Sequence, residues 1–471
     1  MNPMAKIGLR TPWLFIISIG FAWAAGGSAD LRFITYEQAL PVLKIFHNEL
    51  PAELQKLDSE RMMSSWPMWV QNRDREVRAR LDQGEEDTLT NLLRFGVTYT
   101  KQPRIDWPSL FQYGQNAGIT FMAQQRTDDL IRILANPGTN EHFLTMRAFL
   151  EKKGFAFKTA RERDGVRKYL LANLSRMQAE FAGYREKMRA LQASKAEESK
   201  LMELDSHLFE KRGISLDTNI RPNFAIDQAL RDLAGRGLLK TRKVYRVAII
   251  GPGLDFVNKE EGADFYPPQT IQPFAVMDSL LRYGLADPTT LEIVTYDISS
   301  SVNQHIHRAR RNAAANRGYT IQLPLDGTKI WSSEFTAYWN KFGDQIGAPA
   351  KAFPVPQETP ELKIRAVRIR PEFLLKVSPE DMNVVFQREP LPETRQFDMI
   401  IGTNIFVYYG PFEQALARAN LSSMVRPAGF LLSNNFLAGE GLSELRQEGR
   451  TTVALSKRGE TETIFWYRRS K

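Results

Sequence analysis

Two short apolar stretches of the chain end in residues that can contact a ligand. Residues 244–250 are rich in valine and isoleucine, which predicts a buried strand, and Gly251-Pro252-Gly253 follows directly. Glycines allow a sharp turn and let a ligand approach the main chain closely. Residues 291–296 predict a second strand, which ends at Asp297. In doubly wound α/β sheets, a glycine turn after the first strand and an acid after the second bind the phosphates and the ribose of a nucleotide.

Both features also have an interpretation without a ligand. A strand can end in Gly-Pro-Gly because the chain turns there, and an aspartate after a strand is often the N-cap of the next helix. Their combination favours a nucleotide site, because the carboxyl ends of neighbouring parallel strands meet at one edge of a sheet. A long segment, residues 257–272, separates the glycine turn from the next predicted helix.

Polar and aromatic residues follow a later strand. Residues 397–401 predict a buried strand, and Thr403, Asn404 and Tyr408 come soon after it. Asn404 and Tyr408 are placed where they could orient a substrate, and their alternative roles are loop capping and packing. A structural metal site is not expected, because the chain has no cysteine and its five histidines lack the spacing of metal ligands on a helix.

Length and composition describe an ordinary globular protein of two or three domains. The chain has 471 residues, of which 43% are apolar and 25% charged, and its net charge is +9. The positive charge is spread along the chain, which indicates a solvated surface and argues against nucleic acid as a partner. The lack of cysteine excludes disulfides and is compatible with an oxidising compartment. Composition leaves the oligomeric state open.

The N-terminus has the form of an export signal. Lys6 and Arg10 precede or flank the start of an apolar run at residues 13–25, and small residues at 24–29 offer cleavage sites. We therefore expect residues 1–29 to be a signal peptide or, if uncleaved, a membrane anchor, although the run is short for a membrane span. This pattern predicts a bacterial protein that is exported to the periplasm or anchored in the inner membrane, with membrane contact only through this segment.

Residues 30–240 predict a helical domain. Pro67 is expected at a helix boundary, and residues 127–129 have the composition of an N-cap and a first helical turn. The tryptophans of this part are interpreted as packing between helices rather than as a ligand surface: Trp66, Trp69 and Trp107. No group of residues in this half has the pattern of a catalytic site.

The longest helix is expected to begin near Thr159-x-x-Glu162, a capping-box pattern, and to extend toward residue 208. Apolar residues recur in it at alternating spacings of three and four over residues 174–191. This seam predicts an antiparallel helix hairpin within the domain rather than a long coiled coil between molecules.

Residues 241–471 predict an α/β domain in which strands alternate with helices. Residues 430–434 form another apolar run after a glycine-containing turn, and two runs that flank residues 457–460 predict a final hairpin. Residues 319–381 form a long insertion that could cover a site as a lid or shape a substrate pocket.

In this order, the motifs resemble those of the class I S-adenosylmethionine-dependent methyltransferase family. The resemblance covers residues 240–471 and is carried by the glycine turn, Tyr296-Asp297, the strand at 397–401, and the turn and strand of residues 421–434. The final hairpin fits too, because this family ends its sheet with an antiparallel strand. The run Asn404-Ile405-Phe406-Val407-Tyr408 is most similar to the chemotaxis-receptor carboxyl methyltransferase branch.

The resemblance implies a Rossmann-like, mostly parallel, seven-stranded sheet with helices on both faces, S-adenosylmethionine as the cofactor, and an unidentified methyl acceptor. It implies that these residues contact the cofactor: Gly251, Pro252, Gly253, Asp255, Asp297, Glu389 and Thr403. Asn404 and Tyr408 are expected to orient the acceptor, and no residue is assigned as a general base.

Two alternatives stay open. The first is another nucleotide-binding enzyme, such as an NAD-dependent oxidoreductase, against which the antiparallel hairpin argues. The second is a noncatalytic exported binding protein that keeps a degenerate methyltransferase fold. The export signal favours this second alternative, because S-adenosylmethionine is a cytosolic metabolite and an exported enzyme would lack its methyl donor.

Overall fold

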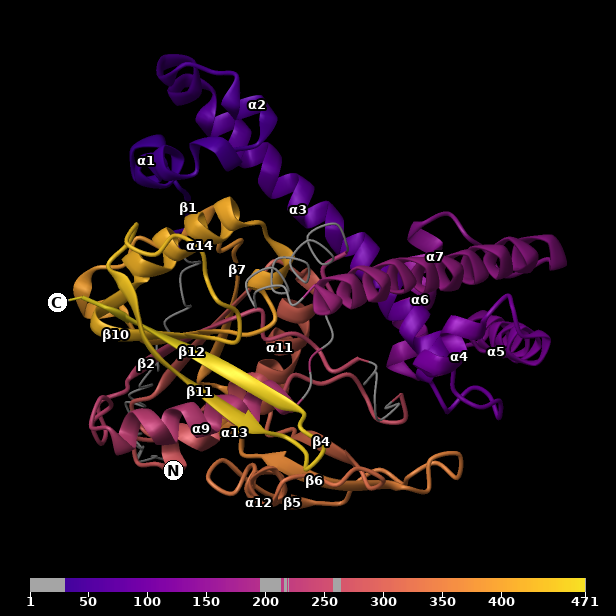
Figure 1. Ribbon diagram of the computed structural model, residues 1–471. Helices are drawn as coiled ribbons and strands as arrows, with labels where there is room; N and C mark the ends of the chain where they lie inside the picture. The colour runs from indigo at the N-terminus through magenta and orange to yellow at the C-terminus, as the bar shows by residue number, and fades with distance from the viewer. Residues whose placement is uncertain (1–29, 195–212, 216–217, 219, 257–263, 471) are drawn as a thin grey trace, which may run out of the picture.

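The computed structural model describes residues 30–194, 213–215, 218, 220–256 and 264–470, and Figure 1 shows their arrangement. The α-helices are α1 (Tyr36–Ile45), α2 (Ala52–Gln55), α3 (Ser59–Phe95), α4 (Trp107–Gln112), α5 (Ala117–Ala135), α6 (Glu141–Lys152), α7 (Ala160–Ala193), α9 (Arg221–Gly235), α10 (Gln272–Arg282), α11 (Ser300–Ala314), α12 (Ser333–Lys341), α13 (Pro371–Leu374) and α14 (Pro411–Met424). Short 3-10 helices cover His47–Glu49, Glu393–Arg395 and Phe406–Tyr408. The strands are β1 (Arg32–Phe33), β2 (Arg246–Ile250), β3 (Glu292–Asp297), β4 (Tyr319–Asp326), β5 (Gly347–Ala350), β6 (Leu362–Ile369), β7 (Val377–Asp381), β8 (Gln387–Arg388), β9 (Phe397–Gly402), β10 (Val425–Ser433), β11 (Leu445–Ala454) and β12 (Thr461–Arg469).

Two of the expectations from the sequence concern residues that the structure does not describe. The export signal at residues 1–29 and the extension of the long helix beyond residue 194 lie outside the described residues. Across the described ranges, no helix combines the length and the apolar character that crossing a membrane requires.

The C-terminal half is built on a seven-stranded sheet with the order β11-β12-β10-β9-β2-β3-β7. The five strands from β10 to β7 in this order pair in parallel, as alternation of strands and helices predicts. β12 is antiparallel to both β10 and β11, and it forms the predicted final hairpin with β11. The prediction of a mixed α/β sheet that ends in an antiparallel strand is therefore confirmed.

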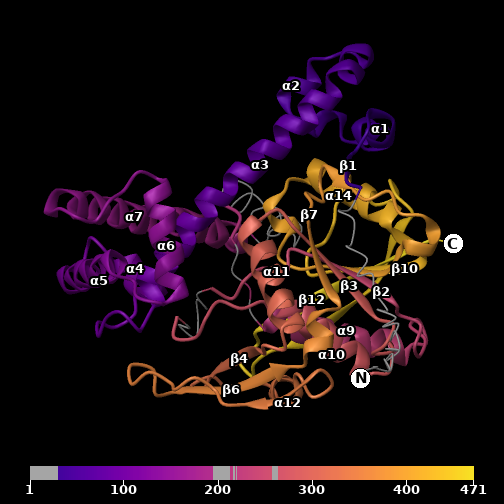
Figure 2. The same cartoon turned by 180° about the vertical axis from the view of Figure 1, so that it is seen from behind.

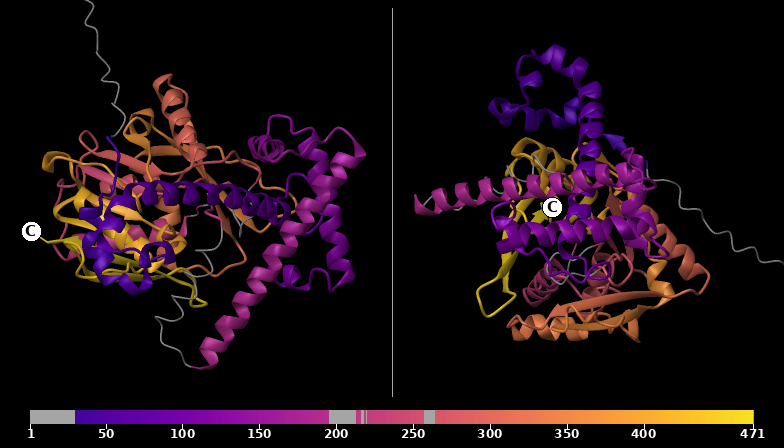
Figure 3. Two further views of the ribbon diagram at one scale, coloured as in Figure 1. Left: turned by 90° about the horizontal axis from the view of Figure 1, so that it is seen from above. Right: turned by 90° about the vertical axis from the view of Figure 1, so that its right-hand side faces the viewer.

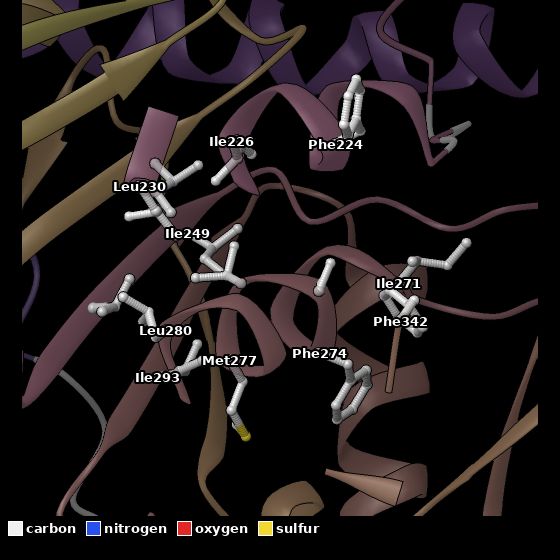
Figure 4. Packing of buried hydrophobic residues seen from close by; sticks show 14 of the residues in the cluster. Phe224, Ile226, Leu230, Ile249, Ile271, Phe274, Met277, Leu280, Ile293 and Phe342 are labelled. Atoms are coloured by element: carbon white, nitrogen blue, oxygen red, sulfur yellow. The ribbon is translucent and has the colours of Figure 1, made fainter. Parts of the chain in front are cut away.

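Neighbouring residues of the central strand face opposite sides of this sheet. Ile249 of β2 packs in one core with α9, α10 and α11, whereas Ile250 packs in another with α1, α3 and α14. Figure 4 shows the first core, in which Ile249 lies beside Leu230 of α9 and Leu280 of α10. Helices cover both faces, which explains why residues 247–250 of β2 are all apolar rather than alternating.

The N-terminal helices join the second of these cores. Trp66 and Trp69 of α3 stack with ring centroids 5.0 Å apart, and Trp69 lies 6.1 Å from Phe412 of α14. The indole N–H of Trp66 donates to the carbonyl of Ile34 at 2.9 Å. Both indoles are buried, as expected for packing, whereas Trp107 is 38% exposed and lies against Phe181 of α7.

The described helix of greatest length is α3, with 37 residues, and not α7, with 34. Pro67 was expected at a helix boundary, but it lies inside α3. Proline removes one backbone hydrogen bond, and burial of Trp66 and Trp69 on either side of it holds the helix together across the gap. α3 runs diagonally from α2 to the group of α4, α5, α6 and α7, as Figures 1 and 2 show.

The start of α5 also differs from the expectation. Residues 127–129 were predicted to begin a helix, but α5 begins at Ala117, after an N-cap by the Asn116 side chain. Thr127 is buried in the middle of α5, and its hydroxyl donates to the carbonyl of Ala123 at 2.8 Å. A threonine hydroxyl can bond to a carbonyl of its own helix, so the cap-like composition of residues 127–129 did not mark a helix start.

The predicted capping box of α7 is present. The main-chain N–H of Thr159 donates to the Glu162 carboxylate at 2.7 Å, and the Thr159 hydroxyl accepts from the Glu162 N–H at 3.2 Å. Leu174 and Met177 of the apolar seam pack with α4 and α5. Figure 3 shows that the far end of α7 projects from the body of the protein.

Most of the segment interpreted as an insertion forms a small antiparallel sheet of its own, with the order β4-β6-β5. It lies with α12 at the end of the molecule opposite α1 and α2 (Figures 1 and 2). The last part, β7, is the edge strand of the main sheet beside β3.

Candidate functional site

A cavity lies at the carboxyl edge of the main sheet, where β2, β3, β7 and β9 end. About 710 Å³ of empty space lies between its walls, part of it open to solvent. Of the residues selected from sequence, six line this cavity: Gly251, Gly253, Asp297, Thr403, Asn404 and Tyr408. Parallel strands bring these positions together from three separate parts of the chain.

The turn after β2 needs its glycine. Gly251 and Gly253 have φ angles of +61° and +64°, in the left-handed region that side chains disfavour. The N–H of Gly251 donates to the carbonyl of Tyr296 at 2.8 Å, which fixes the turn against the end of β3. A Cβ atom on Gly251 would lie 2.1 Å from Cδ1 of Ile405. The main chain of this turn is therefore open to close approach only because a side chain is absent.

Asp297 is the one carboxylate among the described residues that line the cavity. Its Oδ1 accepts a hydrogen bond from the N–H of Ser299 at 2.8 Å, and the nearby N–H of Gly253 also favours the charged carboxylate. Burial raises the pKa of Asp297 to about 7, and the nearby carboxylate of Asp381 adds to this rise. The N-cap of α11 is Ser299, whose side chain accepts from Val302 N–H, so Asp297 is not needed for that role.

The residues after β9 are held by specific hydrogen bonds. The Thr403 hydroxyl accepts from the Gln272 amide at 2.8 Å. Asn404 has a φ of +60°, and its N–H donates to the Asn434 side chain at 2.8 Å. The Tyr408 hydroxyl accepts from the N–H of Ser215 at 3.3 Å. Thr403, Asn404 and Tyr408 form the part of the cavity wall that follows β9.

Three residues selected from sequence do not line the cavity. Pro252 is buried within the turn. Asp255 is 2% exposed, and its carboxylate accepts from the Tyr266 hydroxyl and the Gln269 amide, both at 2.9 Å, so it holds the following loop in place. Glu389 accepts a hydrogen bond from the Tyr296 hydroxyl and stands behind that ring, one residue removed from the cavity.

The cavity wall also includes residues from the helical half that the sequence did not single out. Leu81 of α3, together with Ile214, Ser215 and Thr218, closes the side facing away from the sheet. The signal for this wall was a glycine inside a helical pattern: a Cβ on Gly84 would lie 1.9 Å from the carbonyl oxygen of Ile214. The chain around residue 214 therefore crosses α3 in backbone contact.

Arg78 fixes α3 above the cavity. Its guanidinium bonds to Asp74 on the same helix at 3.0 Å and to Asp381 at the end of β7 at 2.7 Å. It also approaches the carbonyl of Ile298, directly after Asp297, at 3.5 Å. The helical half is therefore bound to the same strand ends that carry the cavity.

The histidines serve other contacts. The His142 ring bonds to the carbonyl of Tyr266 at 2.7 Å, and the His305 ring bonds to the Tyr319 hydroxyl at 3.0 Å. Burial lowers the pKa of both rings, that of His305 to about 4. Within the described ranges, no cluster of three or more histidine or acidic residues is arranged to hold a metal ion.

The wall of the cavity carries groups that could contact a nucleoside. The glycine turn exposes main chain where a Cβ would clash, Asp297 supplies a carboxylate for ribose hydroxyls, and the remaining wall near β7 is apolar through Met382 and Val384. The residues expected to hold the ribose and the neighbouring part of S-adenosylmethionine are Gly251, Gly253 and Asp297.

No protein-family model matches the chain, and no curated protein matches it closely enough to count as a relative. Several solved methyltransferases resemble parts of the structure. The magnesium protoporphyrin IX methyltransferase of Synechocystis, solved with bound S-adenosylmethionine, is 10% identical over 53% of this chain and 79% of its own, with a TM-score of 0.26. The N-methyltransferase NodS of Bradyrhizobium japonicum is 11% identical over 52% of this chain and 98% of its own, with a TM-score of 0.25. At these values the similarity assigns neither an activity nor a substrate to this chain.

Proposed function

We propose that this protein is an S-adenosylmethionine-dependent methyltransferase with an unidentified acceptor. The observation that carries the proposal is the meeting of Asp297 with the Gly251 and Gly253 turn in one cavity at the carboxyl ends of β2 and β3. The antiparallel β12 supports a methyltransferase over a dehydrogenase-type sheet. The similarity to the chemotaxis-receptor branch rests on the run at residues 404–408 alone.

Each part of the cavity has a role in this proposal. S-adenosylmethionine supplies an activated methyl group on a sulfonium, which is already a good leaving group, so the chain need not activate it. Asp297 and the glycine turn bind the nucleoside, while Asn404 and Tyr408 orient the acceptor. Leu81 and Ile214 exclude water from the opposite side.

Calorimetry with purified protein tests the proposal directly. S-adenosylmethionine and S-adenosylhomocysteine are expected to bind at one site per chain, and NAD is expected not to bind. Binding of NAD in place of the two sulfur nucleosides would support the oxidoreductase alternative. Absence of binding by all three would support a noncatalytic protein that keeps the fold.

A further inference from the structure

A network of three polar side chains begins at Asn404 in the cavity wall and extends through Asn434 to Glu462. The Asn434 amide nitrogen donates to Oδ1 of Asn404 at 2.7 Å and to Oε1 of Glu462 at 3.1 Å. The Oδ1 of Asn434 accepts from the main-chain N–H of Asn404 at 2.8 Å. These residues come from the ends of β9 and β10 and the start of β12, which meet at the same edge of the sheet.

The direction of every hydrogen bond in this network follows from its two ends, the main-chain N–H of Asn404 and the carboxylate of Glu462. A main-chain N–H can only donate, so the oxygen of the Asn434 amide must face the N–H of Asn404. The Asn434 nitrogen then faces the Asn404 side chain and the carboxylate of Glu462, which can accept both of its hydrogens. The Asn404 amide must therefore turn its oxygen toward Asn434. This assignment follows from the network and does not depend on distinguishing N from O in either amide.

The ionisation of Glu462 does not reverse this direction. Burial raises the pKa of Glu462, and the nearby Arg221 opposes that rise. If one oxygen were protonated, the other would still accept from Asn434. The start of β12 therefore keeps an acceptor facing Asn434 in either state.

One pair of hydrogen-bond donors is left over at the cavity. The Oδ1 of Asn404 is engaged, whereas its Nδ2 has no hydrogen-bond partner within the part of the chain that the structure describes. Asn404 lines the cavity and is held in a left-handed conformation, with φ of +60°, by the bond from its N–H. Asn404 is exposed, so its Nδ2 hydrogens are available to a molecule in the cavity, whereas its Oδ1 is already engaged.

We propose that Asn404 donates its two Nδ2 hydrogens to the methyl acceptor, and thereby selects an acceptor that carries a carbonyl or carboxylate oxygen beside its reacting atom. The inference rests on the proposed function and names the class of acceptor. A primary ammonium group would place its own donors against those of Asn404. A phosphate dianion is disfavoured too, because the cavity wall contains Asp297 and has no lysine or arginine among the described residues. Asn434 and Glu462 act as positioning residues.

Small probes test the polarity of Asn404 without knowledge of the acceptor. Protein labelled with ¹⁵N in asparagine side chains is saturated with S-adenosylhomocysteine and titrated with acetate, acetamide or methylammonium at high millimolar concentration. The Asn404 amide signal, identified by its loss in Asn404→Ser, is expected to shift with acetate and acetamide and not with methylammonium. Asn420 is the internal control, because its buried amide donates to the carbonyls of Val384 and Val385 and should not respond.

Asn434→Asp separates positioning from a merely structural role. The substituted side chain has no donor, so the Asn404 amide must turn its nitrogen toward it and present oxygen to the cavity. Acetate should then lose its effect, and methylammonium should gain one. If the like charges at positions 434 and 462 prevent folding, Asn434→Asp with Glu462→Gln restores a donor between them, and the same exchange of response is expected.

The results are distinguishable from failure of the proposed function. Normal binding of S-adenosylhomocysteine, with an Asn404 amide that ignores acetate or responds to methylammonium, would overturn the inference. An unchanged probe preference in folded Asn434→Asp would overturn it as well. Loss of S-adenosylhomocysteine binding with an intact response to acetate would instead remove the proposed function and leave the donor pair of Asn404 in place.

Discussion

The carboxylate of Asp297, at the end of β3, lies close enough to the turn after β2 that the main-chain N–H of Gly253 stabilises its charged form. The two residues are far apart in the sequence, and parallel pairing of Ile250 with Tyr296 brings their strand ends level. The same carboxylate lines the cavity and is almost fully buried. The turn therefore stabilises part of the negative charge that the proposed function assigns to the ribose hydroxyls.

Asp297→Ala should weaken S-adenosylmethionine binding by about one to two powers of ten. A hydrogen bond to a charged group contributes roughly 1.5–3 kcal/mol, and each 1.4 kcal/mol is about tenfold in affinity. Asp297→Glu should recover part of this loss at most, because the longer side chain displaces the carboxylate. Calorimetry measures the affinity, and thermal unfolding of the same samples reports whether the fold survives.

Asp326 provides the matched control for Asp297. It ends β4, and its Oδ1 accepts from the N–H of Thr328 at 2.8 Å, as Asp297 accepts from Ser299 at the same distance, but it lies outside the cavity. Asp326→Ala should leave the affinity unchanged. Equal affinities for Asp297→Ala and Asp326→Ala, both folded, would remove Asp297 from the binding site.

The affinity for S-adenosylmethionine should rise with pH and level off above about pH 7. Hydroxyl groups donate to the charged form of Asp297, whose pKa is raised to about 7 by burial, so binding below this pH must release a proton. Asp381 repels this charge, while Arg78 is paired with Asp381 and partly offsets it. Calorimetry across pH 5.5–8.5 should show the rise, and Asp297→Asn should abolish it.

The same group affects stability with the opposite sign. The folded pKa lies above the ordinary value of 3.8, so the folded protein binds the proton more tightly than the unfolded chain. The contribution of Asp297 to stability is therefore fully present below about pH 4 and is lost as pH rises to about 7. Urea unfolding of the ligand-free protein and of Asp297→Asn should diverge over this interval; parallel curves would contradict the assigned pKa.

Much of the sheet and part of the cavity wall could be predicted because both depend on local patterns. Residues 244–250 and 397–401 are apolar runs of strand length, and glycine or polar residues mark where they end. The order of such strands determines which ends meet. Gly251, Asp297 and Thr403 could therefore be selected without knowledge of the structure.

The rest of the site depends on contacts between distant segments. Leu81 and Ile214 reach the cavity through the crossing of α3 by a segment far along the chain, and no local pattern encodes that crossing beyond the lone Gly84. Asp255 was selected because it follows the glycine turn, but the loop that returns with Tyr266 engages its carboxylate. The helix boundary predicted at Pro67 was wrong for a similar reason, because burial of Trp66 and Trp69 overrides the preference of proline to end a helix.

The N-terminal segment should place the described part of the chain outside the bacterial cytoplasm. Lys6 and Arg10 favour retention of the amino end inside, and the apolar run that follows favours transfer of what comes next. We expect activity from a reporter that works only outside the cytoplasm when it is fused at the C-terminus. Deletion of residues 1–29 should abolish that activity. Activity of a cytoplasmic reporter instead would place the domain with the cellular methyl donor and strengthen the methyltransferase proposal.

Arg78→Ala should loosen the helical wall of the cavity. It removes charged hydrogen bonds to Asp74 and Asp381, each worth roughly 1.5–3 kcal/mol when buried and less here because Arg78 is 28% exposed. We expect about 1–2 kcal/mol lower stability together with weaker S-adenosylmethionine binding. Arg75→Ala, on an exposed part of the same helix, is the control and should change neither. Lower stability with unchanged affinity would show that α3 does not shape the site.

Gly251→Ala should lower both the stability of the protein and its binding of S-adenosylmethionine by more than backbone strain alone explains. A left-handed φ costs a non-glycine residue about 1–2 kcal/mol, and at Gly251 the new Cβ would also meet Cδ1 of Ile405 at 2.1 Å. Gly441 separates the two effects, because its φ is +84° but no atom lies within 4 Å of the position a Cβ would take. Gly441→Ala should therefore lower stability by the strain alone and leave binding of S-adenosylmethionine intact. Adding Ile405→Ala to Gly251→Ala removes the clash but not the strain, so it should restore stability toward that of Gly441→Ala. Binding of S-adenosylmethionine by Gly251→Ala at the affinity of the unsubstituted protein would show that the cofactor does not approach this turn.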